Sequence, residues 1–154
     1  MKTIILYATK HGAAAEIAQR IANKIDGAVI HNLKQDIPSL ADFDCIIIGS
    51  SVYAGMIRKE AKKLLRKNEN TLQEKKLGLF LCGIGAGGEK EYFEKNFPSE
   101  LLQKAKASSF LGGIFDPQKA GVIERFIIKI VTKKTRYINT IDDDKIEPFV
   151  RALQ

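Results

Sequence analysis

The chain of 154 residues predicts an α/β fold, in which helices cover both faces of a doubly wound, five-stranded parallel sheet. Two observations predict this class. Short apolar runs alternate along the chain with segments whose apolar residues recur at helical spacing. The runs at 4–6, 46–48 and 110–111 are continuous, which is typical of parallel strands buried on both faces. No repeat, low-complexity tract or linker divides the chain, so we expect a single domain over residues 1–154.

The strands are expected near 3–7, 28–33, 45–49, 77–81 and 110–115. Helices are expected between them, because apolar side chains repeat at intervals of three and four residues. The first stripe contains Ala14, Ile17, Ala18, Ile21 and Ile25, the second Ala61, Leu64 and Leu65, and the third Tyr92, Phe93 and Phe97. A last helix is expected over 142–152, with Asp142 or Asp143 as its N-cap.

Ligands of such sheets bind at the carboxyl ends of the strands, where three loops are expected: 8–13, 50–56 and 82–88. The first loop leads into a helix, whose free backbone N–H groups favour an anion. Thr9 supplies a hydroxyl, Lys10 a charge, and Gly12 allows close approach of the backbone. A capping threonine and a turn glycine explain the same letters without any ligand.

The second loop, GSSVYAG, offers the hydroxyls of Ser50 and Ser51 and a tyrosine, Tyr53, that is able to lie against a flat ring. Ordinary turn chemistry is the alternative. The third loop contains GIGAGG, which formally matches the dinucleotide motif G-x-G-x-x-G. It follows the wrong strand and lacks a ribose-binding acid, so we expect backbone contacts to a planar ligand instead. Cys82, at the start of this loop, is either a redox thiol or a buried structural cysteine.

Other chemistries lack their residues. The chain has no G-x-x-x-x-G-K-[ST] phosphate loop and no G-x-S-x-G nucleophile elbow, and His11 and His31 have no metal-ligand spacing. Cys45 lies in an apolar run and is expected in the core. We therefore predict neither a metal site nor a catalytic side chain.

Two stretches carry a resemblance to a known family. YATKHGAAAEIAQRIA resembles the first strand, phosphate loop and first helix of the flavodoxin-like proteins, and DFDCIIIGSSVYAG resembles their third strand and second flavin loop. GGIFDPQKAGVIERFIIKIVTKK, residues 112–134, is similar to a segment of the branch that includes menaquinone-dependent protoporphyrinogen dehydrogenase. The resemblance implies the strand order 2-1-3-4-5 and an FMN cofactor.

The resemblance also implies which residues hold FMN. The phosphate would be surrounded by Thr9, Lys10, His11, Gly12, Ala13 and Ala14. The isoalloxazine would be flanked by Ser51, Val52, Tyr53, Ala54, Gly55, Gly83, Ile84, Gly85 and Ala86. The chain departs from the family at Ala14, where a Thr or Ser is expected, and in its compact 82–88 loop, where the enzyme branch has a longer insertion. A missing hydrogen bond to a charged group weakens binding by about 1.5–3 kcal/mol.

Residues 120–134 form a predicted helix with more apolar residues than one core stripe needs, among them Val122, Phe126, Ile127, Ile130 and Val131. Basic residues surround them, and the whole chain carries a net charge of +7. Contact with an anionic membrane is one interpretation. A helix buried on two sides and a homodimer face are the others, and no nucleic-acid binding is expected because stacking aromatics are missing.

The sequence therefore predicts an FMN-dependent oxidoreductase that passes electrons between a reduced donor and a quinone-like or porphyrin-like acceptor. A non-enzymatic electron carrier with a redox partner protein is an alternative, and a flavin-free interaction module that has kept the fold is another. Met1-Lys2 runs directly into the first predicted strand without the pattern of a secretion signal. We expect the protein in the cytoplasm or at the inner face of a membrane.

Overall fold

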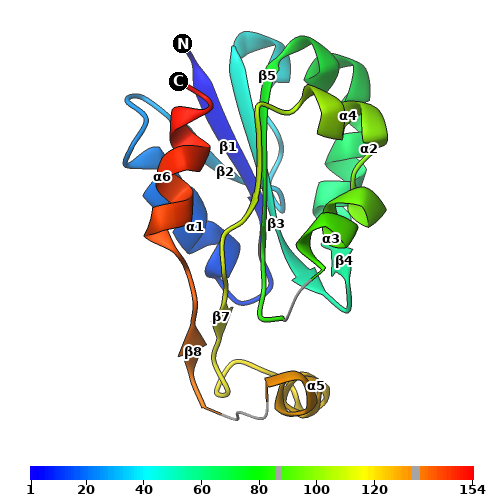
Figure 1. Ribbon diagram of the computed structural model, residues 1–154. Coiled ribbons are helices and arrows are strands. Elements are labelled where there is room, and N and C mark those ends of the chain that lie inside the picture. Colours follow the sequence, from blue (N-terminus) through cyan, green and yellow to red (C-terminus); the bar gives the residue numbers. More distant parts are fainter. Residues whose placement is uncertain (86–87, 133–135) are drawn as a thin grey trace.

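The computed structural model describes residues 1–85, 88–132 and 136–154, with the side chains of residues 123, 127, 131 and 132 outside the description. Its five parallel strands are β1 (Thr3–Ala8), β2 (Val29–Asn32), β3 (Cys45–Tyr53), β5 (Lys76–Cys82) and β6 (Ala107–Phe110). They lie in the order β2-β1-β3-β5-β6 (Figure 1). In strand numbers along the parallel sheet this is 2-1-3-4-5, so the predicted fold class is confirmed.

Helices cover both faces of the sheet (Figure 1). One layer contains α1 (Ala13–Ala22) and α6 (Asp143–Arg151), and the other contains α2 (Lys59–Glu74), α3 (Glu89–Asn96) and α4 (Ser99–Lys104). A short 3-10 turn, η1 (Leu40–Asp42), precedes β3, and β4 (Met56–Ile57) pairs antiparallel with the end of β3. The third predicted helix is thus two short helices, because Phe97 and Pro98 adopt extended backbone between them.

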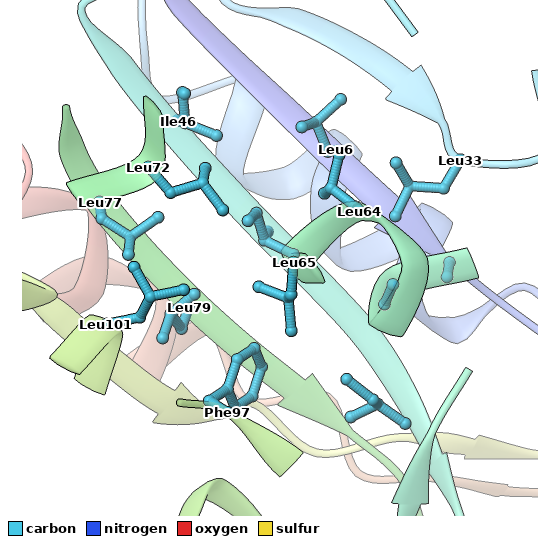
Figure 2. Packing of buried hydrophobic residues seen from close by; sticks show 14 of the residues in the cluster. Leu6, Leu33, Ile46, Leu64, Leu65, Leu72, Leu77, Leu79, Phe97 and Leu101 are labelled. Atoms are coloured by element: carbon cyan, nitrogen blue, oxygen red, sulfur yellow. The ribbon is translucent and has the colours of Figure 1, made fainter. Parts of the chain in front are cut away.

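The layer of α2 packs on a leucine-rich core (Figure 2). Leu64, Leu65 and Leu72 of α2 lie against side chains that point from one face of the sheet, including Leu6, Ile46 and Leu79. Alternate residues of the same strands, such as Ile5 and Ile47, belong to the core under α1 and α6. Since the strands bury both of their faces, their sequences are continuous apolar runs, as predicted.

The core under α1 and α6 contains a close aromatic contact. The rings of Phe80 and Phe149 meet edge to face, with centroids 6.3 Å apart. A Cβ at Gly49 would lie within 1.9 Å of the Phe80 ring, so only glycine leaves room for it. Asp142 caps α6, because its side chain accepts a hydrogen bond from the Asp144 N–H. Cys45 is fully buried in this core, as expected.

The fifth strand differs from the prediction. It was expected over 110–115, but the sheet strand β6 already ends at Phe110, and Ile114–Phe115 form a separate strand, β7. Gly112 separates them with a left-handed φ of 85°, which ends the extended backbone. β7 pairs antiparallel with β8 (Ile138–Asn139), and α5 (Val122–Thr132) lies between these two strands.

We call residues 114–132 and 136–139 the arm. It extends beyond the carboxyl ends of the parallel strands and carries α5 across them (Figure 1). α5 begins two residues later than the predicted helix 120–134, because Ala120 and Gly121 are not helical, and Lys133 and Lys134 lie outside the described residues. In the described parts of the chain, no helix has the length and apolar character needed to cross a bilayer.

Candidate functional site

The three predicted loops meet around one cavity of about 130 Å³ at the carboxyl ends of β1, β3 and β5. Most of the predicted cofactor-binding residues line it: Thr9, Lys10, His11, Ala13, Ser51, Val52, Tyr53, Ala54, Gly83 and Ile84. The parallel order of the strands brings these loops together, although they are separated by up to about half of the chain.

Other predicted residues lie near the cavity without lining it. Gly12 adopts the left-handed backbone (φ 100°) that turns the chain into α1, and Ala14 is fully buried in the core beneath that helix. Gly55 forms, with Ala54, the two-residue turn between β3 and β4, and both have positive φ. Gly85 is outside the lining, and Ala86 lies outside the described residues.

The arm contributes a wall of the cavity that was not predicted from the sequence. Ile114 and Phe115 of β7, with Glu124 and Ile128 of α5, close the cavity opposite the loops. One signal was present in the sequence: Glu124 is the single acidic residue between Lys119 and Arg136. An isolated carboxylate in a basic helix has many cationic neighbours available, but the sequence does not say which of them it contacts.

The first loop is built to hold an anion. The Gly12 N–H donates to Thr9 Oγ1 at 2.8 Å, which closes the turn before α1. α1 begins at Ala13, so the N–H groups of its first turn have no partner within the helix. Together with the helix dipole, these N–H groups make the loop favourable for negative charge.

A carboxylate of the protein itself contacts two side chains of this loop. The His11 Nε2–H donates to Glu124 Oε2 at 2.6 Å, and Lys10 Nζ forms an ion pair with Glu124 Oε1. Burial on its own raises the pKa of Glu124, but the hydrogen bonds from Lys10 and His11 and the nearby positive charges outweigh it. The pKa of Glu124 therefore lies below its usual range, and the carboxylate is charged at neutral pH.

The second loop contributes an aromatic face and a hydroxyl without a partner. Lys10 Nζ lies 4.2 Å from the centroid of the Tyr53 ring, a cation–π contact on the face expected to meet a flavin. Ser50 is used structurally, because its Oγ accepts a hydrogen bond from the Arg58 N–H. Ser51 Oγ is buried without a hydrogen-bond partner among the described residues, and its residue lines the cavity. A bound polar group would satisfy it.

Cys82 at the end of β5 is a structural cysteine. It is fully buried, its Sγ–H donates to the Ser50 carbonyl at 3.8 Å, and burial raises the pKa of its thiol to about 12. A redox thiol is normally an accessible thiolate, so Cys82 does not serve as one. The described residues also contain no cluster of side chains able to hold a metal ion.

The chemistry of the loops fits the phosphate of FMN better than the present volume fits the whole cofactor. The Lys10 ammonium, the His11 ring, free helix N–H groups and an unsatisfied hydroxyl surround the cavity. The cavity of about 130 Å³ is smaller than the roughly 300–1,000 Å³ that is usual for small-molecule sites. Glu124 and Ile128 of the arm line this small cavity together with the loops.

The strand order, with the loop after β1 at its switch point, defines a flavodoxin-like fold. The chain belongs to the Flavodoxin domain family, whose pattern it matches over residues 4–141. The fold of the predicted family is thereby confirmed, and FMN is the cofactor that agrees with it.

Individual relatives are distant. The chain is 22% identical over 147 residues to protoporphyrinogen IX dehydrogenase [quinone] of Escherichia coli strain K12, a match that covers 86% of this chain and 80% of the relative. Two-electron reduced Megasphaera elsdenii flavodoxin aligns with a TM-score of 0.63 and 13% identity, over 98% of this chain and 97% of that one. A Lactobacillus acidophilus NCFM flavoprotein in complex with FMN aligns with a TM-score of 0.51 and 20% identity, over 72% and 90%.

Proposed function

We propose that this protein binds FMN at the cavity between the three loops and works as a flavodoxin-type redox protein. The observation that carries the proposal is the carboxylate of Glu124, which Lys10 and His11 of the first loop hold. A loop that holds one anion in this way has the charges and donors that a phosphate needs.

Different residues would hold the two ends of the cofactor, its phosphate and its flat ring. Lys10, His11 and the N–H groups of the first turn of α1 would hold the phosphate. Val52, Tyr53 and Ile84 would flank the flat ring, and Ser51 would supply a hydrogen bond. FMN supplies the redox chemistry when bound, and the chain sets its orientation and its exposure to water.

Binding of the whole cofactor requires the arm to move. Glu124 and a phosphate compete for the same two side chains, Lys10 and His11, and the cavity is smaller than a typical cofactor site. We expect FMN to displace Glu124 and to shift α5 away from the loops. The ion pairs are partly exposed, so the cost of this exchange is moderate.

For the reaction, we propose electron transfer to or from a quinone-like or porphyrin-like molecule. Support comes from the E. coli relative, a protoporphyrinogen IX dehydrogenase that uses a quinone, although identity is only 22%. A carrier that exchanges electrons only with a partner protein is the alternative within the family. Turnover separates them: an enzyme consumes protoporphyrinogen or reduces quinone catalytically, whereas a carrier is reduced only by a partner reductase.

A flavin-free interaction module is the second candidate function. It is favoured by the small cavity, by the carboxylate in the anion position and by Ala14, whose buried methyl group replaces the expected hydroxyl. In that case the contact of Glu124 with Lys10 and His11 is a permanent part of the fold.

The absorbance spectrum of the purified protein, before and after incubation with FMN, tests the proposed function. Bands of protein-bound oxidised flavin that persist through gel filtration support it. A protein that takes up no FMN, both as the wild type and as Glu124→Gln, leaves the interaction module as the function.

We also propose that α5 contacts an anionic membrane surface, which would place the protein at the inner face of a membrane. Val122, Phe126 and Ile130 are spaced by four residues and are 80%, 64% and 63% exposed. Arg125 and Lys129 are exposed beside them. A helix with an exposed apolar stripe and basic flanks is suited to lie in the headgroup region, and a homodimer through the same stripe is the alternative.

A further inference from the structure

A basic cleft lies beside α2, and none of its lining residues belongs to the arm. It has a volume of about 510 Å³ and lies between α2 and the junction of α3 with α4. Its apolar surface comes from Met56, Leu65, Phe97 and Pro98. Its charged residues are Lys59, Lys62, Arg66, Lys95 and a single acid, Glu69.

The cations of the basic cleft form no ion pairs with the described residues. The salt bridges among the described residues involve other lysines and arginines, and none includes Lys59, Lys62, Arg66 or Lys95. Lys62 and Arg66 are four residues apart on α2, a spacing at which like charges destabilise a helix. Lys59 is the first residue of α2, where the helix dipole disfavours a cation. The charge arrangement therefore does not serve the stability of α2.

Hydrogen bonds connect the basic cleft with the second loop of the candidate flavin site. Asn96 lines it, and the Asn96 side-chain amide donates to the carbonyls of Gly55 at 2.9 Å and Tyr92 at 2.8 Å. Its Oδ1 accepts from the Ile57 N–H at 3.0 Å. Lys95 Nζ lies 3.5 Å from the position of a Cβ on Gly55. A partner bound in the cleft is thus adjacent to the turn that follows Tyr53.

We propose that the basic cleft docks an acidic electron-transfer protein, so that the partner's redox centre lies next to the 53–55 turn. Unpaired cations around an apolar floor match the usual arrangement of an interface, with a polar rim that steers association and a core that excludes water. This electron transfer rests on the proposed function. When this protein is reduced, the redox centre of the partner is oxidised by the same number of electrons, and the opposite holds when this protein is oxidised.

Two other classes of anionic partner fit the basic cleft less well. Nucleic-acid sites use exposed aromatic side chains for stacking, whereas the only aromatic residue of the cleft, Phe97, is 4% exposed. A membrane surface needs a protruding apolar face, whereas here the apolar residues form the floor of a concavity. The protruding apolar stripe of this chain is on α5 instead.

The test uses a plant-type ferredoxin, an acidic iron–sulfur protein, titrated into the isotope-labelled full chain at low and high salt. We expect saturable, salt-sensitive binding, with amide shifts at Met56, Asn96 and the first turns of α2. Lys62→Glu with Arg66→Glu should weaken binding by about tenfold or more. The matched control is Lys63→Glu with Lys67→Glu, which changes the same charge on the same helix but lines a different cleft, and it should change the dissociation constant by less than about threefold.

Three results would overturn the docking proposal: no binding of ferredoxin at low salt, equal weakening by both pairs of substitutions, or tighter cleft-dependent binding of a short duplex DNA or of phosphatidylglycerol vesicles. Thermal unfolding of each variant, with Lys62→Gln plus Arg66→Gln as a milder pair, identifies any loss of fold. The titration is performed on both the apo and the FMN-treated protein. Docking without FMN uptake would refute the proposed function alone, whereas FMN uptake without docking would refute this inference alone.

Discussion

The sheet with its covering helices differs from the arm in how far its apolar side chains are buried. In the sheet, residues such as Ile46 and Leu79 are completely buried between two layers of helices. In the arm, Val122, Phe126 and Ile130 are mostly exposed, and α5 contacts the loops through the ion pairs of Glu124. The first region is held by the burial of apolar area between two layers of helices, whereas the contact of α5 with the loops includes partly screened charges.

This difference indicates where the molecule tolerates change. Close-packed cores resist any alteration of volume, so the sheet keeps the three loops in place. A segment with few buried apolar contacts opens at low cost. The arm is therefore the region that we expect to move when a ligand enters, and four experiments test the contrast.

Substitution in the sheet should have the largest effect. Phe80→Ala removes a fully buried ring packed against Phe149 and should lower the free energy of unfolding by about 3–5 kcal/mol. Phe126→Ala removes the same side chain from the arm and should change it by less than about 0.5 kcal/mol. Urea denaturation measures both. A comparable loss in the two variants would show that the arm is part of the cooperative core.

The exposed stripe of α5 should matter for surfaces instead of stability. Phe126→Asp with Ile130→Asp should weaken partitioning into phosphatidylglycerol vesicles by about tenfold or more, because two apolar anchors become charges. Val29→Asp, which adds a charge at an exposed apolar residue of β2, is the control and should leave partitioning nearly unchanged. Vesicle sedimentation gives the partition coefficient. If instead the double variant turns a dimer into a monomer, the stripe is a homodimer face.

Removal of the carboxylate from the arm should favour the cofactor. Glu124→Gln frees Lys10 and His11 and should tighten FMN binding by about fivefold, or ~1 kcal/mol. Quenching of flavin fluorescence gives the dissociation constant. Glu147→Gln, which removes a similar ion pair between α6 and Lys24 on the surface, is the matched control. Weaker FMN binding by Glu124→Gln would mean that Glu124 clamps the cofactor rather than competing with it.

The smallest effect on stability is expected from a change of pH, through protonation of Glu124. Because the pKa of Glu124 is lower in the folded state than in the unfolded chain, its contribution to stability is complete above the ordinary carboxyl pKa of about 4.3. That contribution is lost as the pH falls through the lower folded value, which should release the arm before the sheet unfolds. Side-chain NMR of Glu124 follows the titration, and Lys10→Gln should move the pKa of Glu124 upward. An unchanged pKa in that variant would contradict the ion pair.

Much of the sheet was predictable and the arm was not, for a physical reason. A strand that is buried on both faces has a continuous apolar sequence such as CIIIG, so its position can be predicted from the sequence. The loops follow from the strands, which explains why Thr9, Tyr53 and Gly83 were expected together. The position of Glu124 depends on how a helix packs across the sheet end, and no local pattern encodes that. The fifth strand was displaced because residues 110–115 are apolar on both sides of the Gly112 turn.

The pairing of β7 with β8 brings the two ends of the arm together, so the arm is a segment that can be replaced by another one. Ile114 lies opposite Asn139 and Phe115 opposite Ile138, so the chain leaves and re-enters the body at a single point. Because Phe115 pairs with Ile138, a two-residue hairpin turn can join these two residues in place of the segment between them. The rest of the fold needs no other change in its connections. Such a trimmed protein would retain the three loops without their cover. It would also offer a place where a different lid, with a different specificity, can be grafted onto the same sheet.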